Sequence, residues 1–436
     1  IYTEASQGDG SGTPKFAQVI TPCIDLTNVS CAALEFYYHM YGADIDRIRV
    51  DVDTGTATSK YVTSVATLIG QKQTSSNQPY EKAFISLEQF SGRIIRIRFV
   101  GRKNTSVSQD KNDMAIDDIT VFEPTPVDVE MTDYFTPQNG YCSYSNAEVV
   151  TGKLQSLGCQ TLTSIPIACR IERTWPNGTT VTNQIIRDTL TGNYPLGSDT
   201  AFAFTPTANL SGYGEYRLWI YSEVPGDTIP SNDTIGFYYI EHREPVTTFP
   251  YILDFDGPTT TPGNGTSGNA GVTGTDDWER IPDPANGGFA FHVMEGKTPS
   301  AGTGPRFDYS LQGTYIYTEG NYGSAPVSAV FASKCISLVG MTNPSIEFMY
   351  HMFGADIGAI ALQIVPANSN TWINPPGGSI SLTADKHTSS IQDWKYWKVD
   401  LSTWAGQVIK IRFIGQKTGN GSAADIGIDD ISIYNS

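Results

Sequence analysis

Two stretches of this chain, far apart, carry almost the same sequence. Residues 36–45 read FYYHMYGADI and residues 348–357 read FMYHMFGADI, so eight of ten positions agree. Further pairs agree in the same order: residues 92–103 with 406–417 (seven of twelve positions), AIDDI (115–119) with GIDDI (427–431), residues 1–4 with 316–319, and Cys23-Ile24 with Cys335-Ile336. A repeat of this length predicts two homologous domains, so whatever fold the chain adopts is built twice.

Both copies have the residue pattern of β-strands. In one stretch, Ile409, Ile411 and Phe413 alternate with Lys410 and Arg412. The same alternation of apolar and polar positions runs through residues 345–352. A period of two places one face of a strand in a core and the other in solvent. The GADI segment supplies the turn that follows, and no stretch shows helical periodicity with caps. We therefore predict an all-β sandwich for each copy.

The composition agrees with this fold class and excludes some functions. Charged residues make up 17% of the chain and hydrophobic residues 39%, with 42 Gly, 25 Pro and 23 Tyr. Such a mixture is typical of many-stranded β proteins. The net charge of −17 argues against nucleic-acid partners and suits an extracellular protein or one that recruits cations. No apolar run approaches the roughly 20 residues that span a bilayer, so no membrane insertion is predicted.

The segment between the two copies lacks the repeat. Proline-containing stretches flank it, FEPTPVD at 122–128 and EHREPVTTFP at 241–250. Short alternating runs separated by turn residues predict an immunoglobulin-like sandwich there, and its expected role is that of a spacer. The predicted domains are 1–124 for the first copy, 125–246 for the spacer and 247–436 for the second copy.

The second copy has a leading segment that the first copy lacks. It runs from Pro250 through LDFDG, DDWERI and RFDYSLQGTY to Ile316. A sandwich without its first strands would leave an open edge. We therefore expect the chain to be a fragment of a longer repetitive protein. Neighbouring repeats of that chain, or a second chain, would complete the first sandwich.

The order of these motifs resembles that of the MAM domain family. The second copy has, in order, LDFDG, Trp278, Cys335-Ile336, IEFMYHMFGADIG, KYWKVDLS, GQVIKIRFIG and DIGIDDISI. The resemblance covers the second copy in full and the first copy except for its first third. The resemblance implies a jelly-roll sandwich for each copy, an extracellular or cell-surface location, and adhesion or recognition rather than catalysis. The middle segment is similar to immunoglobulin-like domains of large secreted Bacteroidota proteins.

The aspartates are candidate metal ligands. The resemblance offers Asp256, Asp308 and Asp429 as ligands of a structural Ca²⁺, with Asp117 as the counterpart in the first copy. Adjacent strand residues face opposite sides, so Asp429-Asp430 cannot both hold one ion. A calcium ion takes about six to eight oxygens and would need carboxylates from distant strands. The alternative is that these carboxylates are solvated or cap the backbone at strand ends.

The histidines and tryptophans are weaker candidates. His39 and His351 lie mid-strand and are expected to be partly buried, each bonded to a neighbouring strand, because no second histidine lies at ligand spacing. The remaining three, His242, His292 and His387, are isolated in the sequence. Trp394 and Trp397 are candidate ligand-facing aromatics of a carbohydrate site, with core packing as the alternative.

The six cysteines follow no zinc-binding pattern. Cys23 and Cys31 are close enough in sequence to bridge a strand end. Cys142, Cys159 and Cys169 could form one bridge and leave a free thiol, and Cys335 has no obvious partner. The usual animal MAM cysteine pattern is absent. Disulfides would suit an oxidising compartment.

No catalytic signature is present. The chain has no HExxH, GxSxG, Walker or dinucleotide-binding motif, so no catalytic residue is predicted. Four Asp-Thr-aliphatic triplets resemble the O-glycosylation signal of exported Bacteroidota proteins and give the candidate acceptors Thr189, Thr200, Thr228 and Thr234.

These observations predict a non-enzymatic adhesion or recognition protein, secreted or displayed at the cell surface. Its expected partner is a surface protein or a glycan, and repeated weak modules would gain avidity from their linkage. Two alternatives stay open: the accessory region of an exported protease or glycosidase, and a carbohydrate-binding protein.

Overall fold

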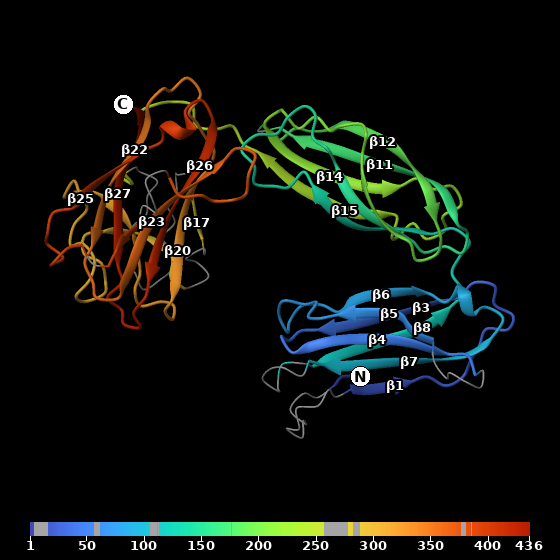
Figure 1. Cartoon of the computed structure of the whole chain (residues 1–436). Coiled ribbons are helices and arrows are strands. Elements are labelled where there is room, and N and C mark those ends of the chain that lie inside the picture. The colour runs from blue at the N-terminus through green and yellow to red at the C-terminus, as the bar shows by residue number, and fades with distance from the viewer. Residues whose placement is uncertain are drawn as a thin grey trace.

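The computed structural model describes residues 1–3, 16–55, 62–104, 111, 113–175, 177–256, 278–281, 288–375, 381–384 and 386–436. These residues form β-strands, two short 3-10 turns (η2, Glu88–Phe90; η4, Ser402–Trp404) and loops. Figure 1 shows three bodies joined in series, with the outer two connected at opposite ends of the middle one. The predicted all-β sandwich fold is confirmed. Across these residues, no helix is long and apolar enough to span a membrane.

The third sandwich is built from two facing sheets. One contains, in order, β18 (Phe291–Glu295), β19 (Thr314–Thr318), β27 (Ile426–Asn435), β22 (Pro344–Met352) and β25 (Lys395–Asp400), with β16 (Tyr251–Leu253) also paired to β27. The other contains β17 (Trp278–Ile281), β20 (Val327–Ser333), β26 (Val408–Lys417), β23 (Ile357–Pro366) and β24 (Ser381–Thr383), with β21 (Ile336–Ser337) paired to β26. The alternating residues Ile346, Phe348, Tyr350 and Met352 are buried between the sheets, as predicted.

The first sandwich repeats most of this arrangement. Its sheets are β6 (Glu81–Ser86), β3 (Ala33–Met40) and β8 (Met114–Phe122), facing β1 (Phe16–Ile20), β7 (Ile94–Lys103), β4 (Ile45–Asp53) and β5 (Val62–Ile69), with β2 (Ile24–Asp25) paired to β7. Phe36 and Phe99 cross edge to face at 5.0 Å between ring centroids. Their equivalents Phe348 and Phe413 cross the same way at 4.9 Å. The repeated sequence therefore builds the same core twice.

The middle body is a separate sandwich with its own core. Its sheets are β13 (Asp199–Ala203), β10 (Thr151–Ser156) and β9 (Val129–Thr136), facing β12 (Thr180–Tyr194), β11 (Leu162–Thr174), β14 (Gly214–Ser222) and β15 (Thr234–His242). Tyr134 of β9 stacks on Tyr238 of β15 with ring centroids 3.8 Å apart. The described residues thus form three hydrophobic cores. The domain limits 1–124, 125–246 and 247–436 stay predictions.

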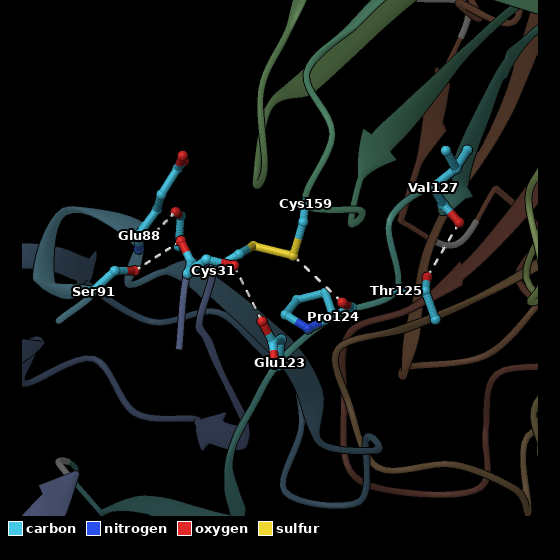
Figure 2. Close-up of a disulfide and its surroundings, with 10 residues drawn as sticks. Cys31, Glu88, Ser91, Glu123, Pro124, Thr125, Val127 and Cys159 are labelled. Atoms are coloured by element: carbon cyan, nitrogen blue, oxygen red, sulfur yellow. Dashed lines mark hydrogen bonds between the residues drawn. A yellow bond between two sulfur atoms is a disulfide. The ribbon is translucent and has the colours of Figure 1, made fainter. Parts of the chain in front are cut away.

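Two disulfides join the sandwiches, and they correct the pairings expected from sequence. Cys31 bonds Cys159, which links the first sandwich to the middle one beside the connecting residues Glu123 and Pro124 (Figure 2). Cys142 bonds Cys335 and links the middle sandwich to the third. The expected Cys23–Cys31 bridge is therefore wrong, and so is a bridge within the middle domain. Proximity in sequence failed because each bond spans a domain boundary.

The two remaining cysteines are thiols. Cys169 is buried in the middle core, and burial raises its pKa to about 12. Cys23 is exposed, although its equivalent in the third sandwich, Cys335, carries a disulfide. The first copy uses Cys31 instead, at a position where the third has Asn343.

Polar contacts support both junctions. At the first, Lys82 Nζ lies 2.8 Å from Glu130 Oε2. At the second, Lys410 Nζ donates to the Gly140 carbonyl at 2.8 Å, and the Cys142 N–H donates to the Ala367 carbonyl at 2.8 Å. Val246 pairs in parallel with Ile336, so the linker itself joins the third sandwich.

Candidate functional site

A cluster of aspartates lies at one end of the third sandwich. This carboxylate cluster comprises Asp254, Asp256, Asp308, Asp429 and Asp430. Asp308 and Asp429 are buried, whereas Asp256 is exposed. Backbone amides hold three of the side chains: the Tyr309 N–H donates to Asp429 Oδ2 at 2.9 Å, that of Ser310 to Asp308 Oδ2 at 2.9 Å, and that of Thr314 to Asp256 Oδ1 at 2.6 Å.

A bulge in β27 brings the last two aspartates into the cluster. Glu347 pairs with Ser432 and Met349 with Asp429, so β27 carries one extra residue over this interval. Asp430 takes the extra place with a left-handed φ of 47°. Strict alternation along this strand, assumed from the sequence, therefore does not hold at Asp429 and Asp430. The first copy has the same bulge, with Asp118 at φ 46°.

The aspartates of the cluster repel one another when charged. Burial raises the pKa of Asp429 to about 8, and the nearby Asp430 and Asp308 add to the shift. Burial also raises the pKa of Asp430, helped by Asp254, Asp256 and Asp308. The pKa of Asp256 is raised by burial and by Asp254 and Asp308. A bound cation would relieve this repulsion.

The cluster fits a metal ion only in part. It gathers Asp256, Asp308 and Asp429, the three residues suggested by the family resemblance. Across the described part of the chain, however, no three His, Cys, Asp or Glu side chains converge closely enough to hold a metal. Asp117 lies in the other sandwich and is exposed at the bulge of β8, where its carboxylate accepts the Asp118 N–H at 3.1 Å. Its contact matches the backbone-capping alternative.

An aromatic pocket opens beside the carboxylate cluster. Two loops line this hollow of about 180 Å³: Phe307, Asp308, Tyr309 and Leu311 from one, and Ser390, Ile391, Gln392, Asp393 and Trp394 from the other. Leu311 is 70% exposed and Ile391 68% exposed, and Phe307 and Tyr309 are also exposed. The pocket thus combines apolar surface with carboxylate, amide and hydroxyl groups.

Trp394 connects the two loops that line the pocket. Its Nε1–H donates to the Phe307 carbonyl at 2.9 Å, and its ring meets Tyr315 edge to face at 5.4 Å. A Cβ at Gly427 would lie 2.7 Å from the Trp394 ring, so this glycine leaves room for the indole. The other sequence candidate, Trp397, lies outside the pocket, where it packs against the core beside Tyr350.

The sequence singled out Trp394 and Asp308 but missed the rest of the pocket. Phe307, Tyr309 and Leu311 alternate with polar residues and so look like one more strand. The structure places them in a loop, where all three are exposed. Exposure depends on how the loop packs, so periodicity alone could not reveal it.

Two of the histidines expected to be separate are in contact. The rings of His351 and His387 stack with centroids 4.1 Å apart, and both side chains are buried. His387 Nδ1 accepts the Met352 N–H at 3.0 Å. Burial and the neighbouring His387 lower the pKa of His351 to about 3, so the pair is neutral at pH 7. In the first copy Gln73 occupies the place of His387 and accepts the Met40 N–H at 2.6 Å.

The third sandwich also contains a buried polar cluster of Ser300, Glu319, Lys417 and Asp425. Glu319 accepts the Ser300 hydroxyl at 2.9 Å, and Asp425 accepts the Gly320 N–H at 2.8 Å. Burial and Glu319 raise the pKa of Asp425 to about 8. Lys417 Nζ donates to the Gly320 carbonyl at 2.7 Å and places a positive charge inside the cluster. Because the Lys417 ammonium already supplies a positive charge, this cluster needs no bound cation. We therefore interpret its residues as stabilising the fold.

A larger hollow of about 730 Å³ lies between the middle and third sandwiches. Its lining mixes both signs of charge with aromatic rings and includes Trp175, Tyr213, Arg243, Glu244, Glu279 and Lys334. The Arg173 guanidinium already lies over the Trp175 ring, 3.6 Å from its centroid. This hollow therefore offers less free aromatic surface than the pocket around Trp394.

The four candidate O-glycosylation sites lie on the middle sandwich. Thr189, Thr228 and Thr234 are exposed, and Thr200 is half-buried. Their preceding aspartates have structural contacts: Asp188 accepts the Thr205 N–H, Asp227 accepts the Val129 N–H, Asp233 accepts the Ser222 hydroxyl, and Asp199 pairs with Lys153. These contacts give the triplets a role in folding that does not require modification.

Comparison with solved structures returns matches of low similarity. A Bacteroides uniformis β-glucuronidase matches at 12% identity and a TM-score of 0.26, over 56% of this chain and 27% of its own. The K1 cleaved adhesin domain of Lys-gingipain from Porphyromonas gingivalis W83 matches at 14% identity and a TM-score of 0.26, over 42% of this chain and 97% of its own. A CBM22 tandem domain of Paenibacillus barcinonensis Xyn10C matches at 12% identity and a TM-score of 0.26, over 71% of this chain and 91% of its own. At these TM-scores the likeness carries no functional argument.

Comparison with protein families gives a clearer result. The model of the MAM domain (meprin/A5/mu) matches residues 1–126 and 278–436, which together exceed half of the chain. Both matched ranges contain the repeated core strands and the bulged Asp-Asp motif. The chain therefore belongs to the MAM domain family.

Proposed function

We propose that this chain is a non-enzymatic adhesion or recognition protein that acts outside the cell or at its surface. In this proposal the third sandwich binds its ligand in the aromatic pocket. The observation that carries the proposal is the set of exposed apolar side chains Phe307, Tyr309, Leu311 and Ile391 around one hollow. Contiguous apolar surface of this kind marks interaction sites.

The ligand is a surface protein or a glycan. The glycan is the second candidate function, and the lining of the pocket favours it. Aromatic rings such as Trp394 and Tyr309 suit an amphipathic sugar face. Asp393 and Gln392 supply acceptors and donors for hydroxyl groups. If the chain is instead the accessory region of an exported protease or glycosidase, the same pocket would hold the substrate near that enzyme.

The disulfides support an extracellular setting. Disulfides persist in oxidising environments, and this chain has two that join domains. The middle sandwich is proposed to be an immunoglobulin-like spacer that sets the distance between the two MAM sandwiches. An origin in the Bacteroidota and O-glycosylation at Thr189, Thr200, Thr228 and Thr234 are part of the same proposal.

A structural calcium ion at the carboxylate cluster is also proposed. The raised pKa values of Asp429 and Asp430 support it, because a cation would favour the charged carboxylates. We expect CaCl2 to raise the melting temperature of the third sandwich, and Asp308→Asn to remove most of this effect. Calorimetry in EDTA and in CaCl2 tests it. An equal calcium effect in Asp308→Asn and wild type would contradict it.

Ligand screening of the intact chain tests the main proposal. Arrays of glycans and of extracellular proteins would be probed with wild type, Tyr309→Ala and Phe237→Ala. Phe237 is an exposed aromatic on the middle sandwich and serves as the matched control. We expect Tyr309→Ala to lose about ten-fold or more in affinity for any hit, and Phe237→Ala to bind normally. Hits that survive Tyr309→Ala unchanged would place the ligand elsewhere.

A further inference from the structure

We propose that the first sandwich binds a long acidic polysaccharide on an arginine-rich face of one of its sheets. This proposal concerns a site of its own and does not depend on the function proposed for the third sandwich. The arginine face comprises five side chains of the neighbouring strands β4 and β7: Arg47, Arg49, Arg96, Arg98 and Arg102. In Figure 1 β7 lies on the side of the first sandwich that points away from the middle one.

The register of the two strands puts the arginines on one side of the sheet. Arg47 lies opposite Arg102, and Asp51 lies opposite Arg98. Directly opposed residues of an antiparallel pair share a face, and so do alternate residues of one strand. The residues between the arginines, such as Ile48, are buried in the core. The arginines therefore lie on the outer face of the sheet.

A buried aspartate joins two of the arginines. The Asp51 carboxylate lies 2.9 Å from Arg49 Nε and 2.6 Å from Arg98 Nη2, and it accepts the Ser64 N–H at 3.0 Å. Burial would raise the pKa of Asp51, but the Ser64 amide and the two guanidinium groups hold it below its usual value. The carboxylate is therefore ionised, and its one negative charge faces two positive charges.

A second aspartate joins two further arginines. Arg47 Nη2 and Arg102 Nε each lie 3.1 Å from the Asp46 carboxylate, and these arginine side chains are 38% and 45% exposed. Arg96 and Asp53 lie opposite each other farther along the same strands. Five arginines and three aspartates leave the face with a surplus of two positive charges, in a chain whose net charge is −17.

The third sandwich shows that the fold does not require these arginines. At the positions of three of them it has neutral residues: Ala359, Ala361 and Gln416. Its Arg412, the equivalent of Arg98, donates to the neutral Gln363 side chain at 2.9 Å. Both sandwiches pack the same core beneath this sheet, so the additional guanidinium groups of the first are not needed to form it.

The donors on the face identify the class of ligand. A guanidinium presents its N–H groups in a planar fork that fits a carboxylate or a sulfate. Gln18 of β1 and Thr67 of β5 lie in one row with Arg49, and their amide and hydroxyl groups suit sugar hydroxyls. A row of this kind fits an extended acidic polysaccharide.

An acidic peptide fits this face less well. The strands β4 and β7 are the two inner strands of the order β1-β7-β4-β5, so their backbone groups already pair with neighbouring strands. An extended peptide gains much of its affinity from backbone hydrogen bonds at a free sheet edge. On the arginine face it would have only its side chains for binding.

The small surplus of charge makes binding depend on the length of the ligand. A long polyanion brings many anions to the face and releases condensed counterions when it binds. At physiological salt, where screening acts over about 8 Å, two charges would not hold a short glycan. Short array glycans therefore report on the aromatic pocket, and long polymers at low salt report on the arginine face.

Titration of the whole chain with long polymers is the test. Heparin carries sulfates and carboxylates, polygalacturonate carries only carboxylates, and dextran is the neutral control. We expect saturable binding of the polyanions at about 50 mM NaCl, weakening steeply with salt, and no binding of dextran. Binding of heparin alone would assign the face to sulfated polysaccharides, and binding of both would assign it to carboxylate-bearing ones as well.

A double variant locates the binding on the arginine face. Arg47→Ala/Arg102→Gln introduces the residues of the third sandwich, and Arg187→Ala/Arg217→Ala removes two exposed arginines of the middle sandwich as the matched control. We expect the first variant to bind about ten-fold more weakly, with the slope of log affinity against log salt smaller by about two, and the control to bind as wild type. Tyr309→Ala should also bind the polyanions as wild type, so either proposal can fail alone.

A measurement on wild type stands even if the double variant misfolds. Bound polyanion should slow the modification of Arg47 and Arg102 by phenylglyoxal, followed by mass spectrometry, and leave Arg187 unchanged. Unslowed modification, absence of polyanion binding, or equal binding by the two double variants would overturn the proposal. Binding of polyglutamate as tight as that of the polysaccharides would also overturn it, because the ligand would then be an acidic protein segment.

Discussion

The first and third sandwiches have similar cores and differ in the segments that surround them. Phe36 crosses Phe99 as Phe348 crosses Phe413, and both last strands contain the same bulge. The aromatic pocket depends on Phe307 to Leu311, which belong to the leading segment of the third copy. The comparison teaches that the repeated sequence builds the framework, whereas residues 250–316 of the third copy add edge strands and one side of the aromatic pocket.

The largest expected effect compares how much stability two equivalent phenylalanines contribute to the first and third cores. Phe→Ala in a core costs about 3–5 kcal/mol. We expect Phe413→Ala to cost more than Phe99→Ala, because Phe413 also contacts Trp278 whereas Phe99 borders an open hollow. Calorimetry that follows the transition of each sandwich measures the difference. Equal losses would show that the leading strands add little to the third core.

The pH dependence of stability should also differ between the two copies. The pKa of His351 is lowered in the fold to about 3, so below pH 6.5 the unfolded chain binds a proton that the folded chain refuses. The stability that His351 contributes above pH 6.5 is therefore lost as the pH falls toward 3, by at most about 1.4 kcal/mol per pH unit. Asp425 and Asp429, whose pKa burial raises to about 8, act in the opposite direction, so the histidine effect is the difference between wild type and variant. His387→Gln, which copies Gln73, should reduce this loss, because His387 contributes to the shift.

Melting temperatures from pH 7 to pH 4 give the measurement. Gln73→His is the reciprocal variant, and it should make the first sandwich more sensitive to acid. An unchanged pH profile in both variants would show that the stacked histidines do not cause the acid sensitivity.

A smaller effect concerns the space beneath Trp394. Gly427 corresponds to Ala115 in the first copy, where Tyr80 stands in the place of Trp394. Gly427→Ala places a methyl group against the indole and should cost about 1–3 kcal/mol. It should also lower the affinity for ligand by displacing Trp394. Combining it with Trp394→Tyr, as in the first copy, should restore stability but not binding.

The smallest effect on stability is expected at the rim of the pocket. Ile391 is exposed, and the first copy has Asn77 at this position. Ile391→Asn should change the free energy of unfolding by less than about 0.5 kcal/mol while weakening ligand binding. Urea denaturation and a binding titration measure the two quantities. A large loss of stability would mean that Ile391 belongs to the core.

The sequence predicted those parts of the molecule that depend on local pattern. Alternation at residues 345–352 identified the buried face of β22, and the GADI turn separates β22 from β23. The sequence could not predict features that depend on contacts between distant elements. The disulfides join residues 128 and 193 positions apart across domain junctions. The bulge at Asp430 and the stacking of His351 on His387 depend on how strands and loops meet in space.

The two covalent bridges between sandwiches determine how the molecule carries mechanical load. A pull on the outer sandwiches runs through Cys31–Cys159 and Cys142–Cys335 as well as through the backbone linkers. Because each disulfide bridges a domain junction, the linkers at either end of the middle sandwich cannot extend freely under tension. Tension along the chain would therefore reach the folded sandwiches before either linker is fully extended.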